Sequence, residues 1–235
     1  MNSFKIILSK EDYLKCLWFA LRLWYAKKDS RIYYGMGTKR DAVSYITSMV
    51  RGKLAELSFA KFLSKELGLR VEPDFTIKRT REKISDIYIF LENGRKKLPK
   101  IKINIIATSP NSKFLLIERR TFLKTNYDAY VLIFVDLPRD HLIRLALPML
   151  NIKGELKVNI GEIRTIKTEI FGFVWSDEVK KKAKLVKKNS WLRESNKAKS
   201  KIFLLRSDNY VLPISLLKRS ENEWKKLIDK VFLSN

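Results

Sequence analysis

Residues 129–137 read AYVLIFVDL, and nearly every position in this stretch is apolar. A strand with one face in water alternates apolar and polar residues, whereas a strand covered on both faces is apolar throughout. The stretch therefore predicts a central strand. Because helices are predicted both before and after it, we expect an α/β architecture in which a mixed sheet is flanked by helices.

Two helices are predicted ahead of this strand. Residues 9–28 begin with Ser9-x-x-Asp12, a capping-box-like start. Apolar residues then follow at spacings of three and four, at Leu14, Leu17, Trp18, Leu21 and Trp24. A longer helix is predicted over residues 39–67, with Gly68 as its C-terminal stop.

Short strands are predicted between the second helix and the central strand, at 69–77, 84–91, 101–106 and 113–118, with a hairpin turn at ENGR, residues 92–95. After Pro148 the pattern changes to short strand-like pieces, a lysine-rich run and a final helix. We expect residues 1–148 to form the core and 149–235 to form a smaller, basic, β-rich region, either an appendage or an extension of the same sheet.

The charge of the chain points to a polyanionic partner. Its 235 residues are 46% hydrophobic, enough for a sizeable core, yet 49 Lys and Arg stand against 25 Asp and Glu, a net charge of +24. Nucleic acid is the first candidate, because basic side chains that neutralise phosphates release condensed counterions. A lysine-rich proteome is the alternative, but that bias normally raises Glu together with Lys.

Several function classes are excluded by composition. Cys16 is the only cysteine and His141 the only histidine, so an intrachain disulfide, a cysteine-rich zinc site and a His-pair metal site are ruled out. We expect His141 to occupy a loop or surface position. No window has the length and apolarity of a membrane span, and the N-terminus lacks the pattern of a secretory signal. These features predict a cytoplasmic protein without membrane insertion.

Two acidic residues are candidates for chemistry. Glu56, in GKLAELSFAKFL (52–63), stands on a small, apolar helix stripe, where a charge needs a partner. Asp86, in KISDIYIF (83–90), starts an otherwise apolar strand. A metal ligand is one interpretation of each; a salt bridge is the alternative for Glu56 and a turn cap is the alternative for Asp86.

These two stretches, followed by KINIIATSPNSKFLLI (102–117) and YVLIFVDL (130–137), resemble the PD-(D/E)xK, or restriction-endonuclease-like, nuclease superfamily over residues 48–137. In that family the helix glutamate and the strand aspartate bind a metal ion, and the next strand supplies an acid-x-lysine pair before a Thr/Ser-rich turn. The resemblance implies a restriction-endonuclease-like fold. It also implies that Glu56 and Asp86 would hold Mg or Mn in an active enzyme.

The acid-x-lysine pair is degenerate in this chain. If ATSP (107–110) marks the turn, Asn104 takes the place of the acid and Ile106 that of the lysine. Because alternate side chains of a strand share one face, Lys102, Asn104 and Ile106 are predicted to point together toward the site. Shifting the register by one residue finds only Ile103 and Ile105. Lys102 is a candidate substitute for the missing lysine, with Lys53 and Lys113 as alternatives, and Glu118 is a candidate substitute for the missing acid.

Basic residues cluster in three segments. Residues 78–83 and 95–102 hold the first two, and ten Lys or Arg stand against one Glu between Lys180 and Lys201. Such a run is either a solvated basic face or a phosphate-contacting one, with Trp191 available to stack on a base. The residues predicted to contact nucleic acid are Lys96, Lys97, Lys100, Lys181, Lys182, Lys184, Lys187, Lys188 and Trp191.

The favoured function is nucleic-acid binding by a catalytically degenerate nuclease fold, without a cofactor. Such a pseudoenzyme would suit an accessory or defence-complex subunit beside a partner such as a short Argonaute, and a homodimer is also compatible with the sequence. The alternative is an active Mg- or Mn-dependent nuclease with a relocated lysine. A membrane-surface scaffold is the third hypothesis, although the first helix mixes acidic and basic residues on its polar face, unlike a lipid-binding helix.

Overall fold

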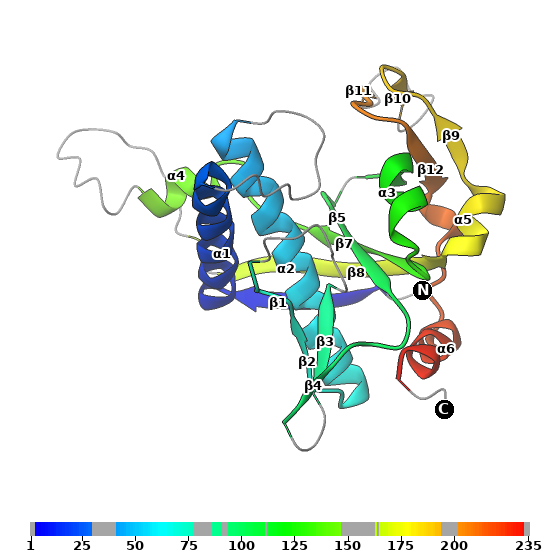
Figure 1. Ribbon diagram of the computed structural model, residues 1–235, viewed down its shortest axis with the longest axis horizontal. Coiled ribbons are helices and arrows are strands. Elements are labelled where there is room, and N and C mark those ends of the chain that lie inside the picture. Colours follow the sequence, from blue (N-terminus) through cyan, green and yellow to red (C-terminus); the bar gives the residue numbers. More distant parts are fainter. Residues whose placement is uncertain are drawn as a thin grey trace.

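The computed structural model of the chain describes residues 3–29, 41–77, 86–90, 94–110, 112–146, 163, 165–193 and 202–232. It confirms the mixed α/β architecture, since a four-stranded mixed sheet lies between helices (Figure 1). The strand order is β1-β8-β7-β5, with β5 parallel to β7 and the other pairs antiparallel. These strands span Phe4–Ser9 (β1), Ile103–Thr108 (β5), Ala129–Val135 (β7) and Thr165–Trp175 (β8).

The central strand is covered on both faces, as its sequence predicts. Every residue of β7 is buried, and alternate side chains enter two different clusters. Val131, Ile133 and Val135 pack with helix residues such as Leu54. Tyr130, Leu132 and Phe134 pack in a second cluster, on the other face of the sheet. The continuous apolar run therefore reflects two cores that share one strand.

Two long helices cover the first face. The helix α1 (Lys10–Asp29) starts with the predicted capping box, because Ser9 N donates to Asp12 and Asp12 N donates to Ser9. Its buried stripe differs from the predicted one, however: Tyr13, Cys16 and Leu23 are buried, whereas Trp18 is 64% exposed. The stripe is rotated because α1 packs along α2 as well as against the sheet.

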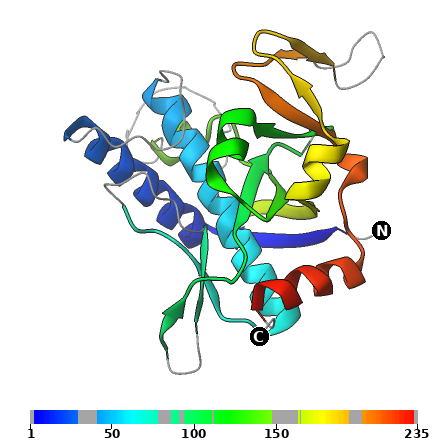
Figure 2. The same cartoon turned by 45° about the vertical axis from the view of Figure 1, so that its right-hand side comes forward.

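The helix α2 (Ala42–Leu67) ends where the sequence predicts. Asp41 caps its N-terminus by accepting a hydrogen bond from Ser44 N at 2.8 Å. Gly68 closes its C-terminus in the left-handed conformation, with φ of 65°. Figure 2 shows α2 crossing the sheet beside α1. No helix in the described part of the chain has the length and apolarity needed to cross a membrane.

Three smaller sheets surround the main one. They have the orders β2-β3-β4, β6-β12-β9 and β10-β11. Residues 92–93 of the predicted turn at 92–95 lie outside the described residues, but β3 and β4 pair antiparallel on either side of the turn. The strands are Val71–Pro73 (β2), Ile87–Phe90 (β3), Lys96–Lys97 (β4), Phe114–Glu118 (β6), Lys184–Val186 (β9), Trp191–Arg193 (β10), Ile202–Leu204 (β11) and Asn209–Pro213 (β12).

The region after Pro148 contributes to the main sheet. The strand β8 lies between β1 and β7, so this part is an extension of the same sheet, whereas β9 to β12 belong to the small sheets. The second face is covered by β6 and β12 with short helices α3 and α5. The remaining helices are α3 (Arg119–Thr125), α4 (His141–Ala146), α5 (Ser176–Lys182), the 3-10 helix η2 (Ile214–Leu216) and α6 (Glu221–Phe232).

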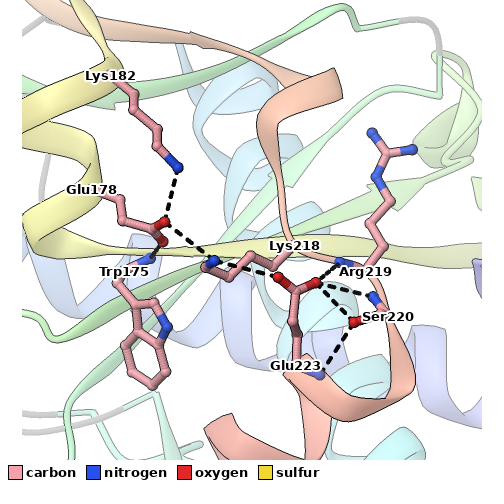
Figure 3. A network of polar contacts seen from close by, with 7 residues as sticks. All are labelled: Trp175, Glu178, Lys182, Lys218, Arg219, Ser220 and Glu223. Atoms are coloured by element: carbon pink, nitrogen blue, oxygen red, sulfur yellow. Dashed lines mark hydrogen bonds and ion pairs between the residues drawn. The ribbon is translucent and has the colours of Figure 1, made fainter.

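A polar network fastens the C-terminal segment to α5 (Figure 3). Lys218 Nζ lies 3.2 Å from a Glu178 oxygen and 3.3 Å from a Glu223 oxygen. Burial by itself would raise the pKa of Glu178, but hydrogen bonds from Lys182 and Lys218 outweigh it and lower that pKa. Beyond this network, the α6 residue Trp224 is buried against Phe62 and Phe173. The chain end is thus part of the first core.

Gly172 of β8 is expected to tolerate no side chain. A Cβ at this position would lie 2.7 Å from the Lys218 carbonyl oxygen, a backbone atom that pairs with Phe173 N. Gly172→Ala should lower the free energy of unfolding by about 1–3 kcal/mol in urea denaturation, because the backbone must shift. Gly52→Ala is the control. Its Cβ would meet nothing within 4 Å inside α2, so it should raise stability by about 0.5–1 kcal/mol.

Candidate functional site

Glu56 is buried in the middle of α2, with 5% of its surface exposed. Its carboxylate forms an ion pair with Lys53, one helical turn earlier, whose own exposure is 8%. Lys53 Nζ also donates to the Asp74 carbonyl oxygen at 2.6 Å, and it lies 4.9 Å from the centre of the Phe19 ring. The salt-bridge interpretation of Glu56 is therefore the one that the structure shows.

Asp86 ties the small β2-β3-β4 sheet to the main sheet. It is 1% exposed, and its Oδ2 accepts a hydrogen bond from Ile105 N of β5 at 3.0 Å. Its carbonyl oxygen accepts from Asp74 N at 3.2 Å. The strand β5 pairs with β7 on one side, so on its other side, at the edge of the main sheet, the Asp86 carboxylate satisfies a backbone donor. The backbone of Asp74 joins this arrangement to Lys53.

Asn104 and Ile106 do not point to the α2 side, which corrects the predicted orientation. In the β5–β7 register they lie beside Tyr130 and Leu132, and Ile106 packs in the second cluster. The residues that face α2 are Ile103 and Ile105, both in the first cluster. The prediction was wrong because it took the orientation of these side chains from the position of the ATSP turn. The orientation depends instead on which alternate residues of β5 pack against α2. Lys102 is exposed and precedes β5.

The described residues on the α2 side do not assemble the set of ligands that a divalent metal ion needs. Such an ion needs several oxygen ligands that converge on one point, whereas one Glu56 oxygen pairs with Lys53 and Asp86 Oδ2 accepts from the backbone of β5. The β5 positions on this side hold isoleucines. No group of three His, Cys, Asp or Glu side chains suited to a metal occurs among the described residues. We therefore derive no metal-dependent step from this site.

A second candidate surface is the basic arm, defined here as residues 180–193 together with 202–212. Figure 1 shows its strands β9 to β12 extending beyond α3 on one side of the molecule. Trp191 is 66% exposed. The predicted contact residues of the arm are all exposed, namely Lys181, Lys182, Lys184, Lys187 and Lys188.

Acidic residues neutralise only part of the basic arm. Lys182 pairs with Glu178 at 2.9 Å, and Lys187 lies 3.4 Å from Asp208. A hydrogen bond from Lys188 N, together with Lys187, lowers the pKa of Asp208 and keeps it ionised. In the part of the chain that the structure describes, no acidic side chain forms an ion pair with Lys181, Lys184 or Lys188.

The other predicted basic contacts lie elsewhere. Lys96, Lys97 and Lys100 are exposed on and beside β4, and Lys96 is 3.9 Å from Glu72. Both ribbon views place β4 and the basic arm at opposite ends of the molecule (Figures 1 and 2). The predicted basic residues at 78–83 lie outside the described residues. The basic contacts thus form separate surfaces rather than one patch.

His141 is fully buried, which corrects the prediction of a loop or surface position. Its ring lies between two helices: Nδ1 is 2.9 Å from the Tyr13 hydroxyl and Nε2 is 3.0 Å from the Thr47 hydroxyl. Burial, and then the positive charge of Arg51, lower the pKa of His141 to about 4, against an opposing effect of Asp140. The imidazole is therefore neutral at pH 7 and joins α4 to α1 and α2.

The buried imidazole predicts a loss of stability in mild acid. Below pH 6.5 the unfolded chain binds a proton at His141, whereas the folded protein binds it only near pH 4. The free energy of unfolding should therefore fall by up to about 3 kcal/mol as the pH is lowered through this window. Urea denaturation at several pH values measures this slope. His141→Gln should show a shallower slope, and equal slopes in both proteins would contradict the assignment.

Comparison of the chain with protein-family models, with characterised proteins and with solved structures gave no match.

Proposed function

We propose that this protein binds nucleic acid through phosphate contacts on its basic arm, and that it does not cut the nucleic acid it holds. The observation that carries the proposal is the set of exposed, unneutralised lysines on the arm, Lys181, Lys184 and Lys188, in a chain of net charge +24. Exposed lysines with little acid nearby are suited to phosphates. Trp191 adds an aromatic face on which a base can stack.

The non-cutting half of the proposal rests on the α2 side of the main sheet. The order of α2, β3, β5 and β7 is compatible with a restriction-endonuclease-like core, with Glu56 on α2 and Asp86 directly before β3. One oxygen of each carboxylate, however, is engaged by the fold, in Glu56 by the Lys53 ammonium group and in Asp86 by a backbone amide of β5. A nuclease-like fold that kept its shape and lost this chemistry would act as an accessory, nucleic-acid-holding subunit.

An active nuclease is the second candidate, and Lys53 is the observation that favours it. This lysine lies beside the helix glutamate, so it is the best-placed substitute for the missing lysine of β5. Against this role, its ammonium group is engaged by both Glu56 and the Asp74 carbonyl. Orienting a water molecule would require Lys53 to leave these partners.

Salt dependence tests the binding proposal. Affinity for labelled single- and double-stranded oligonucleotides should fall steeply between about 50 and 200 mM salt, as expected when several phosphates are neutralised. Gel-shift titrations at several salt concentrations give this slope. Affinity that is absent at low salt, or independent of salt, would contradict phosphate-driven binding.

A further inference from the structure

Arg51 carries a partly buried positive charge. It lies on α2, one turn after Thr47, and its Nε is enclosed by protein without any hydrogen bond within the described structure. A buried donor left unsatisfied in this way lowers the stability of the fold. An unsatisfied buried group of this kind calls for an explanation, and a bound ion is one.

A second guanidinium lies nearby. Arg139 is exposed in the turn between β7 and α4, two residues before His141, whose ring lies 3.0 Å from the hydroxyl of Thr47, one helical turn before Arg51. Burial, and then the positive charge of Arg139, lower the pKa of Arg51. The adjacent carboxylate is already engaged, since Asp140 Oδ1 accepts from Arg144 Nε at 2.8 Å. Among the described residues, no acid is ion-paired with Arg51 or Arg139.

The two arginines are held in position by the fold. Thr47 binds the ring of His141, which fixes the start of α4 against α2. Arg139 follows the carboxyl end of β7, which runs parallel to β5. The carboxyl ends of parallel strands are where α/β sheets commonly bind ligands. Since His141 is neutral at pH 7, it holds the turn without adding a third positive charge.

We propose that Arg51 and Arg139 form a binding site for a phosphate group. The planar guanidinium fork matches phosphate oxygens in pairs, and a phosphate of up to two negative charges would balance two arginines. The shared chemistry is the phosphoryl group. It belongs either to a free phosphate or to the terminal phosphate of a nucleic acid, so the site does not depend on binding by the basic arm.

Thermal unfolding in the presence of inorganic phosphate tests the site. Phosphate should raise the unfolding temperature of the full chain more than chloride at equal ionic strength. This difference should be lost in Arg51→Gln and in Arg139→Gln. Without phosphate, Arg51→Gln should unfold at a higher temperature than the wild type, because the substitution removes an uncompensated charge. Arg139 is exposed, so its variant tests the site even if Arg51→Gln fails to fold.

Arg120→Gln is the matched control, because it removes one charge from an exposed position of α3. It should keep the phosphate response. An equal response in the wild type, in both site variants and in this control would overturn the proposal.

Oligonucleotides of one sequence with 5′-phosphate or 5′-hydroxyl ends distinguish the two phosphate sources. If the terminal phosphate is the ligand, the phosphorylated strand should bind about tenfold more tightly, and Arg139→Gln should remove this preference while leaving binding of the hydroxyl strand unchanged. If the two strands bind equally and inorganic phosphate raises the unfolding temperature, the ligand of the site is a free phosphate. If the two strands bind equally and inorganic phosphate does not raise the unfolding temperature, the proposal is overturned.

Discussion

Lys53→Met is expected to lower the free energy of unfolding by about 3–5 kcal/mol, because it leaves the buried Glu56 carboxylate without its charged partner. The side chains of Lys53 and Glu56 are only 10% and 7% exposed, so water cannot replace the lost ammonium group. The variant also removes the donor to the Asp74 carbonyl oxygen. Urea denaturation at pH 7 measures the loss.

A double variant separates charge burial from packing. In Lys53→Met/Glu56→Leu no buried charge remains, so most of the lost stability should return. Lys61→Met is the matched control, since Lys61 forms an ion pair with Asp12 but is 42% exposed. It should cost less than about 1 kcal/mol.

The same series tests whether Glu56 is a metal ligand. If the Lys53–Glu56 ion pair is structural, Mg²⁺ and Mn²⁺ should leave the unfolding temperature of the wild type unchanged. Lys53→Met with a loss below about 1 kcal/mol, together with metal-dependent stabilisation that Glu56→Gln abolishes, would contradict this account.

Reversing three charges on the basic arm is expected to produce the largest loss of binding. Lys181→Glu/Lys184→Glu/Lys188→Glu lowers the net charge from +24 to +18, since each replacement changes the charge by two. Affinity should fall about 100- to 1,000-fold at low salt if each lysine contacts one phosphate, and the salt slope should become shallower by about three. These lysines are exposed, so the stability of the fold should change little.

A variant with the same net charge provides the control. Lys5→Glu/Lys124→Glu/Lys226→Glu places the three reversals on β1, α3 and α6, all at exposed positions. If the arm is the interface, this control should weaken binding far less than the arm variant. Equal losses in the two variants would mean that net charge, rather than the basic arm, determines binding.

Elements with strong local signals could be predicted from the sequence. The capping box at Ser9 and Asp12, the stop at Gly68 and the apolar run of β7 depend on neighbouring residues, and each is found where expected. The ends of the strands were predicted less accurately. The first predicted strand, 69–77, is reduced to Val71–Pro73, because the chain beyond it turns to let Asp74 bind Lys53 and Asp86.

Features that depend on distant contacts could not be predicted. The direction of Asn104 and Ile106 follows from which face of the sheet α2 covers, and the ATSP turn carries no information about that face. His141 is buried because Tyr13 and Thr47, far away in the chain, supply both hydrogen-bond partners. The i,i+3 spacing of Lys53 and Glu56 was the one sequence signal that could have paired them.

A combined gel-shift and cleavage assay tests the central claim most directly. The full chain would be incubated with labelled single- and double-stranded DNA and RNA in Mg²⁺, Mn²⁺ or EDTA, beside Glu56→Ala and Asp86→Ala. Binding that shifts the nucleic acid without cleavage in any metal is the predicted result. Metal-dependent cleavage that both variants abolish would contradict it, because Glu56 and Asp86 would then be catalytic ligands.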